Sequence, residues 1–288
     1  MDVTEIDPTT PPAPSLNRRV FVGISAAATI AASTAAGSEE ETLGQAHPPL
    51  VAENDPAIAV EHVKLDRRGI ELPAYAAWPA SAGRGTPSVV VIMHIWGVDT
   101  SIRDVVRRYA KAGFAAIAPD LYARFGAPSG DDVTDYTIFS PYAKRLDREV
   151  WLGDVRSAQQ WLAAKFPGTK TAITGFCMGG KLALIAAVEE GDSFAVVAPF
   201  YGAVADIDPK AMHIPVCGSY GARDTGIPAD GVRAFAAALT VPNDIKIYDE
   251  AGHAFFDDQR PSYVASAAAD AWTRTSACFS KYLRVSNP

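Results

Sequence analysis

The chain has 288 residues, of which 48% are hydrophobic, and its 26 basic and 33 acidic residues give a net charge of −7. This excess of acid disfavours nucleic acid as a partner, because phosphate backbones attract basic surfaces. Three cysteines are too few for a small scaffold held by disulfides, and the chain is long enough to bury a core without them.

The amino terminus carries features of an export signal. Residues 17–23, with Arg18 and Arg19 side by side, match a twin-arginine signal, and an alanine-rich stretch follows to Ala36. A membrane anchor is the alternative, but this stretch is too short and too weakly apolar to span a bilayer stably. We therefore expect residues 1–36 to be a signal peptide cleaved after Ala36 or Ala46, no stable membrane insertion, and a periplasmic or extracellular protein.

Residues 37–56 are rich in Glu, Pro and Ala without periodicity, which predicts a disordered linker before a single α/β domain at 57–288. Strands are predicted at 60–65, 70–78, 89–93, 115–118, 171–174, 196–200, 214–220 and 245–248. Helices are predicted at 102–112, 149–166, 181–188, 229–239 and 265–283. This alternation predicts a mostly parallel, twisted sheet with helices on both faces, which binds ligands at the carboxyl ends of its strands.

Chemically versatile side chains gather at those predicted strand ends. They are His94, Tyr122, Cys177, Tyr201, Asp224 and His253. A second cluster, of basic residues, falls on one helix, where the spacing predicts a solvated face rather than a binding surface. It comprises Arg103, Arg107, Arg108 and Lys111. The other two cysteines, Cys217 and Cys278, lie in apolar strand and helix contexts and are expected to be buried small hydrophobes.

The most informative motif is residues 175–180, Gly-Phe-Cys-Met-Gly-Gly, between an apolar strand and a helix-forming run. Glycines two residues before and after Cys177 are typical of a nucleophile elbow, where a side chain would collide with the crossing strand and helix. The turn holds the thiol at a helix amino terminus, which favours a thiolate. A buried cysteine beside a packing glycine is the alternative.

Two partners follow in the order expected of an α/β-hydrolase. Asp224 comes on the loop after one predicted strand, and His253 on the loop after the next. Each has a simpler interpretation, Asp224 as a turn or capping residue and His253 as a hydrogen-bonded loop histidine. The order of nucleophile, acid and histidine on three separate loops favours a catalytic triad.

Several segments of the chain, spanning about residues 60 to 285, resemble the dienelactone hydrolase family. They are residues 89–98, 102–110, 113–124, 175–180 and 252–255. The resemblance implies an α/β-hydrolase fold for 57–288, with Cys177 as nucleophile, His253 as base and Asp224 as the partner of the histidine. It also implies an oxyanion hole made by the backbone N–H groups of Ile95 and Met178.

Two departures from the family pattern concern the substrate. Well-characterised members have a glutamate immediately before the Ile-aromatic-Gly turn, where this chain has His94. They also have an arginine four residues after the catalytic histidine to bind a substrate carboxylate. This chain has Asp257 there, with Arg260 three residues further on.

The sequence thus predicts a hydrolase that cleaves an ester or lactone through a thioester acyl-enzyme, without cofactor or metal. Candidate substrate-binding residues are His94, Trp96, Tyr122, Arg124, Phe255, Phe256 and Arg260. The alternatives are a thioesterase or general carboxylesterase of the same fold, a catalytically inactive binding module, and zinc binding by Cys177, His253, His94 and Asp224, whose spacing does not resemble a metal site. The natural substrate and the oligomeric state stay open.

Overall fold

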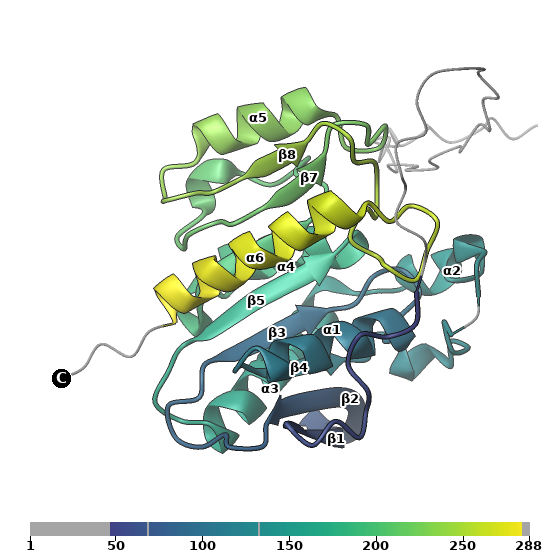
Figure 1. Ribbon diagram of the computed structural model, residues 1–288, viewed down its shortest axis with the longest axis vertical. Helices are drawn as coiled ribbons and strands as arrows, with labels where there is room; N and C mark the ends of the chain where they lie inside the picture. Colours follow the sequence, from purple (N-terminus) through teal and green to yellow (C-terminus); the bar gives the residue numbers. More distant parts are fainter. Residues whose placement is uncertain (1–46, 68, 132, 284–288) are drawn as a thin grey trace, which may run out of the picture. The chain divides into compact units, whose positions relative to one another are not determined.

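A mixed β-sheet forms the centre of the computed structural model, which describes residues 47–67, 69–131 and 133–283 (Figure 1). Within these residues the eight strands lie in the order β1-β2-β4-β3-β5-β6-β7-β8. Their bounds are β1 Ile58–Arg67, β2 Ile70–Pro79, β3 Ser88–Ile92, β4 Ala115–Pro119, β5 Thr171–Phe176, β6 Phe194–Phe200, β7 Ser219–Gly221 and β8 Lys246–Tyr248. The β1–β2 and β2–β4 pairs are antiparallel, and every other pair is parallel.

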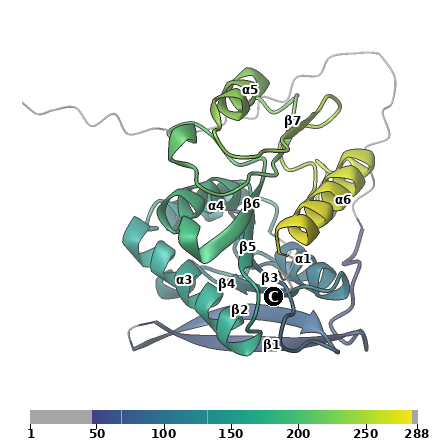
Figure 2. The ribbon, with the colours of Figure 1, turned by 90° about the vertical axis from the view of Figure 1, so that its left-hand side faces the viewer.

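Helices cover both faces of this sheet (Figure 2). Their bounds are α1 Thr100–Lys111, α2 Ser140–Ala143, α3 Arg148–Lys165, α4 Met178–Glu189, α5 Ala229–Ala238 and α6 Ala265–Tyr282. Helices α1 and α6 lie on one face, where the Tyr109 ring contacts Trp272 and Phe279, while α3 and α4 lie on the other. Because both faces are covered, every residue of β3, β4 and β5 is buried, which explains their continuous apolar sequences.

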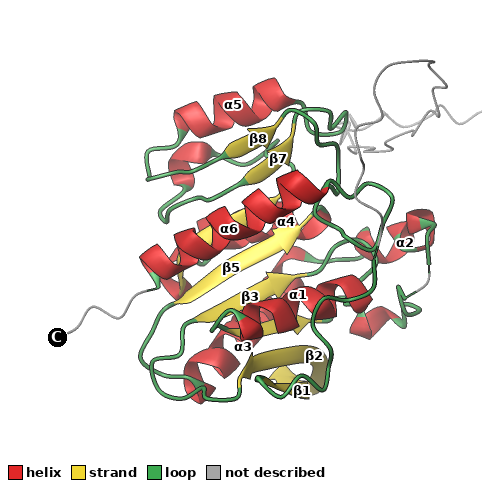
Figure 3. Cartoon of the chain, viewed as in Figure 1, coloured by secondary structure: helices red, strands yellow, loops and turns green. Residues whose placement is uncertain are grey.

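The predicted fold class is confirmed: this is an α/β-hydrolase fold with a mostly parallel sheet. One strand is shorter than expected, because regular pairing of the segment from Ile214 begins only at Ser219. Val216 makes isolated bridges to Val197 and Asn243, next to Pro215, which has no N–H to donate. Short 3-10 helices interrupt the loops at Ala123–Phe125, Tyr136–Ile138, Gly191–Ser193 and Pro209–Ala211 (Figure 3).

The expected linker is wrong for its described part, residues 47–56, which packs against α1. Val51 is 5% exposed; its N–H donates to Asp104 Oδ1 (2.9 Å), and its carbonyl accepts from Arg107 Nε (2.6 Å). Lys111 pairs with Asp55 at 2.7 Å. The expected solvated basic face is wrong for the same reason, since Arg107 is 5% exposed beneath this segment. The predicted signal peptide and residues 37–46 lie outside the described residues.

The interpretation of Cys217 and Cys278 as buried small hydrophobes is wrong in one respect. Both are buried as predicted, but they form a disulfide that joins α6 to the segment before β7, with the two Cα atoms 6.6 Å apart. Cys177 is the free cysteine among the described residues. In the same part of the chain, no helix is long and apolar enough to cross a membrane.

Candidate active site

Cys177 occupies a sharp turn between β5 and α4. Its backbone has φ 54° and ψ −116°, a conformation that residues other than glycine rarely adopt. A Cβ at Gly175 would collide with the Gly179 carbonyl, and one at Gly179 would collide with the carbonyls of Ile92 and Met93. The two glycines are therefore required by the close crossing of β5, α4 and β3, as in a nucleophile elbow.

The structure brings Cys177, His253 and Asp224 into one hydrogen-bonded chain. His253 Nε2 lies 3.0 Å from Cys177 Sγ, and His253 Nδ1 lies 2.6 Å from Asp224 Oδ2. The other carboxylate oxygen of Asp224 accepts from the N–H groups of Gly226 (2.9 Å) and Ile227 (3.1 Å). Asp224 is therefore both the turn residue of the simpler interpretation and the partner of the histidine.

This arrangement shifts the pKa values of the cysteine and the histidine in opposite directions. Burial raises the pKa of the Cys177 thiol, but the hydrogen bond and charge of His253 outweigh it, so the thiol pKa is lowered overall. Burial lowers the pKa of His253, but its hydrogen bonds to Asp224 and Cys177 prevail and raise that pKa to about 10. These shifts favour a proton on the histidine and a negative charge on the sulfur.

The two backbone segments expected to bind an oxyanion lie beside the elbow. Met178 begins α4, and a hydrogen bond from its N–H contributes to the lowered pKa of Cys177. Ile95 lies in the turn after β3, which is closed by a hydrogen bond from Gly97 N to His94 O (3.1 Å). Gly97 has a φ of 83°, which suits glycine at this position in the turn.

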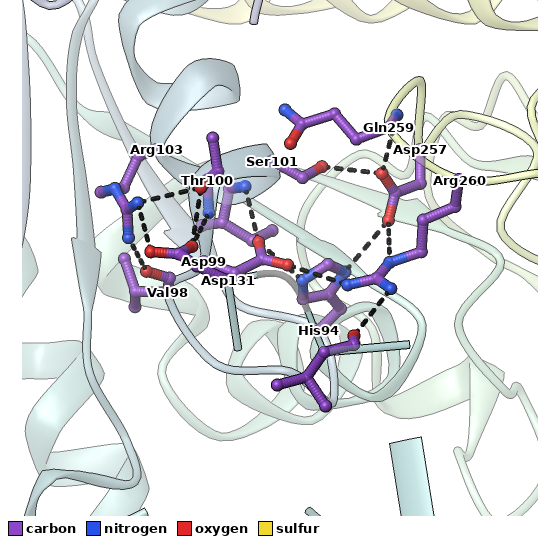
Figure 4. Close-up of polar contacts among 12 residues, drawn as sticks. His94, Val98, Asp99, Thr100, Ser101, Arg103, Asp131, Asp257, Gln259 and Arg260 are labelled. Atoms are coloured by element: carbon purple, nitrogen blue, oxygen red, sulfur yellow. Dashed lines mark hydrogen bonds and ion pairs between the residues drawn. The ribbon is translucent and has the colours of Figure 1, made fainter. Parts of the chain in front are cut away.

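His94 is buried beneath this turn, and its ring nitrogens face carboxylates (Figure 4). Nε2 lies 2.9 Å from Asp99 Oδ1, and Nδ1 lies 3.6 Å from Asp257 Oδ2. Burial lowers the pKa of His94, but the charges of these two aspartates prevail and raise it. A protonated His94 in turn contributes to the lowered pKa of the Cys177 thiol.

For three of the candidate substrate-binding residues, the structure shows a structural role instead. Phe255 and Phe256 are 0% and 2% exposed and pack in an aromatic core, Phe255 against Tyr248 and Phe256 against Phe176. The guanidinium of Arg124 is held by both carboxylate oxygens of Asp154. Phe255 and Phe256 are therefore core residues, and Arg124 has a structural ion pair.

The remaining candidates lie nearer the elbow. Tyr122 is buried, and its hydroxyl donates to the sulfur of Met178 at 3.6 Å. Trp96 is partly buried and stacks under the guanidinium of Arg260, whose central carbon is 3.7 Å from the ring centroid. Arg260 also pairs with Asp99 and Asp257.

The sequence places Tyr201 at a strand end but indicates no role in the site for it or for Asp99 and Asp257. Asp99 is the amino-terminal cap of α1, a role that the sequence signals only locally. Asp257 stands where the family pattern has an arginine, and that difference is its signal in the sequence. Tyr201, at the end of β6, has a φ of 37°, and its ring centroid lies 5.3 Å from that of His253. Its position at a strand end was the only available signal.

Among the described residues, no three His, Cys, Asp or Glu side chains are grouped so as to hold a metal ion. An apolar cavity of about 380 Å³ lies next to the loop of Asp224. Gly226 and Ile227, whose N–H groups bind the Asp224 carboxylate, form part of its lining.

Known proteins resemble this chain in both sequence and structure. A profile of the dienelactone hydrolase family matches residues 72–283. A Yersinia pestis protein named "Putative carboxymethylenebutenolidase" is 38% identical over 232 residues, covering 73% of this chain and 84% of the relative. A protein of the same name from Methylorubrum extorquens is 34% identical over 268 residues, covering 88% and 91%.

Among solved structures, a crystal structure described as a "Putative Dienelactone Hydrolase" from Klebsiella pneumoniae has a TM-score of 0.72 and 32% sequence identity. It is matched over 78% of this chain and 100% of its own length. An esterase from Pyrobaculum calidifontis, at 18% identity and a TM-score of 0.58, shares the fold. The chain therefore belongs to the dienelactone hydrolase family of α/β-hydrolases.

Proposed function

We propose that this protein hydrolyses a carboxylic ester or lactone with Cys177 as nucleophile, His253 as acid and base, and Asp224 as the residue that orients His253. The observation that carries the proposal is the chain of contacts from Cys177 Sγ to His253 Nε2 (3.0 Å) and from His253 Nδ1 to Asp224 Oδ2 (2.6 Å). Thioesters and simple carboxylic esters are further candidate substrates of the same site.

Acylation begins from a thiolate and an imidazolium, the protonation state that the opposite pKa shifts favour. The Cys177 thiolate attacks the carbonyl carbon, and the resulting oxyanion accepts hydrogen bonds from the N–H groups of Ile95 and Met178. The C–O bond to the alcohol then breaks, His253 gives its proton to the departing oxygen, and a thioester to Cys177 remains.

Deacylation uses the same histidine, which is now neutral. His253 takes a proton from water, the hydroxide adds to the thioester carbonyl, and the C–S bond breaks to release the acid and the Cys177 thiolate. His253 keeps the proton that it took from water, so the resting pair of thiolate and imidazolium is restored. A thiolate is a better leaving group than an alkoxide, which suits the site to activated esters, enol lactones and thioesters.

The proposal is tested by trapping the acyl-enzyme. With a slowly hydrolysed p-nitrophenyl ester, the mass of the intact protein should rise by one acyl group, and Cys177→Ala should prevent this. His253→Ala should abolish turnover, whereas the matched change His62→Ala, at a side chain 78% exposed on β1, should not. Acylation of Cys177→Ala, or no turnover of any ester, lactone or thioester by the wild type, would contradict the assignment. The second result would favour a binding module.

We further propose that the protein is exported by the twin-arginine route and works in the periplasm or outside the cell. The pair Arg18–Arg19 is the sequence feature that supports this. The disulfide Cys217–Cys278 supports it independently, because disulfides persist in oxidising compartments. Changing both arginines to lysine should leave the protein in the cytoplasm with an uncleaved signal, and normal export of the double variant would exclude this route.

A further inference from the structure

His94, Asp99, Asp257 and Arg260 form a buried charge cluster (Figure 4). Its residues come from the segment around Ile95 and from the loop that follows His253. Both aspartates are 3% exposed. The cluster is close enough to the thiol for the charge of His94 to lower the pKa of Cys177. The charges of the cluster therefore interact with any substrate group that lies against the turn of Ile95.

Each guanidinium nitrogen of Arg260 donates a hydrogen bond. Nε donates to Asp257 Oδ2 (3.2 Å), Nη2 donates to Asp99 Oδ2 (3.2 Å), and Nη1 donates to the Val133 carbonyl (3.1 Å). One face of the guanidinium is covered by the Trp96 ring. A substrate carboxylate that bound the second N–H of Nη1 or Nη2 would therefore share Arg260 with two buried carboxylates.

The two aspartates are held in turn by α1. The carboxylate of Asp99 accepts from the Ile102 N–H (3.1 Å) as the cap of the helix, and Asp257 Oδ1 accepts from the Ser101 hydroxyl (3.0 Å). Pulling Arg260 away would leave two buried carboxylates with His94 as their remaining cationic partner. Breaking a buried ion pair in this way is strongly unfavourable.

Arg124, the other arginine among the candidate substrate-binding residues, is engaged in the same manner. Its two terminal nitrogens both donate to Asp154, which is 0% exposed and also lies 3.4 Å from Arg67 Nε.

We propose that this active site selects uncharged esters and lactones and discriminates against those that carry a carboxylate near the scissile bond. The inference rests on the proposed ester hydrolysis and specifies its substrate class. A carboxylate would lose hydration on entering the site and would find Arg124 and Arg260 already paired with buried aspartates, so no unpaired arginine there would compensate for the lost hydration. An uncharged apolar group incurs none of these costs.

The test compares two substrates that differ only in charge, mono-p-nitrophenyl adipate and methyl p-nitrophenyl adipate. Each kcat/KM is divided by the rate constant of spontaneous hydrolysis under the same conditions. The methyl ester should be preferred at least about fivefold, and a smaller or reversed preference would overturn the inference. If neither ester is hydrolysed faster than by Cys177→Ala, the proposed function itself fails.

Two variants of the cluster are compared by the ratio of kcat/KM for the methyl ester to kcat/KM for the acid. The fraction of folded enzyme cancels in this ratio. Arg260→Gln should keep the preference for the methyl ester, because Arg260 does not receive a carboxylate. A selective fall in kcat/KM for the acid substrate would mean that Arg260 binds its carboxylate. Asp257→Asn removes one negative charge and one acceptor of Arg260, so the relative kcat/KM of the acid should rise at least about threefold. The matched control Asp230→Asn, at a side chain 96% exposed on α5, should leave the ratio unchanged.

Discussion

Nδ1 of His94 lies 3.6 Å from Oδ2 of Asp257, so the two residues that depart from the family pattern face each other. Well-characterised members have a glutamate at the first position and an arginine at the second. This chain therefore carries a pair of reversed sign beneath the turn of Ile95. The reversal brings a cation, rather than an anion, close to the Cys177 thiol.

Replacing His94 by glutamine should make Cys177 less acidic. A protonated His94 lowers the thiol pKa, so its removal should raise that pKa, and alkylation by iodoacetamide should reach half its maximum rate at higher pH. His94→Glu should move the profile further, while His62→Gln on β1 should leave it unchanged. Identical profiles for the wild type and His94→Glu would show that the charge of residue 94 does not reach the sulfur.

The pH dependence of kcat/KM should have a descending limb set by His253. Its pKa is raised from 6.5 to about 10, so the imidazolium that protonates the leaving alcohol persists up to that pH and is lost above it. Asp224→Asn removes the charge that helps raise this pKa, so the limb should move to lower pH and kcat should fall by about two to four orders of magnitude. Asp249→Asn, on an exposed loop, serves as the control in the same stopped-flow assay. If the descending limb stays at the same pH in Asp224→Asn, the group that titrates there is not controlled by the contact between His253 and Asp224.

Alanine at Gly179 should prevent correct packing of the elbow. The added methyl group would overlap the carbonyl oxygens of Ile92 and Met93, which belong to the β3 segment and cannot move independently of the sheet. We expect a loss of more than about 3 kcal/mol in the free energy of unfolding. Gly231→Ala, with no atom within 4 Å of the new Cβ on helix α5, should instead be neutral or stabilise by up to about 1 kcal/mol. Chemical denaturation measures both, and similar stabilities for the two variants would contradict the crossing geometry.

Loss of the Cys217–Cys278 disulfide should destabilise the fold without removing the nucleophile. The bond closes a loop with a sequence separation of 61, for which about 2–4 kcal/mol is expected. The double variant Cys217→Ala/Cys278→Ala should therefore have a lower Tm but still accept an acyl group at Cys177. Dithiothreitol should lower the Tm of the wild type and leave that of the double variant unchanged. Equal effects on the two proteins would mean that the bond does not form.

The strands, the helices and the elbow could be predicted because their determinants are local. Apolar runs and helical periods identify the elements, and the glycines around Cys177 identify a turn that few other residues permit. The order of Cys177, Asp224 and His253 then suggested which side chains meet, since parallel strands bring their carboxyl ends to one edge of the sheet.

Tertiary structure alone decided which polar groups neutralise one another. Asp257 meets Ser101 across 156 residues of sequence, and Cys217 meets Cys278 because α6 crosses back over the sheet. The burial of Phe255 and the ion pair of Arg124 depend equally on distant segments. A side chain's type states what it can bind, but the partner it binds depends on which segments are packed against it, and only the folded chain determines that packing.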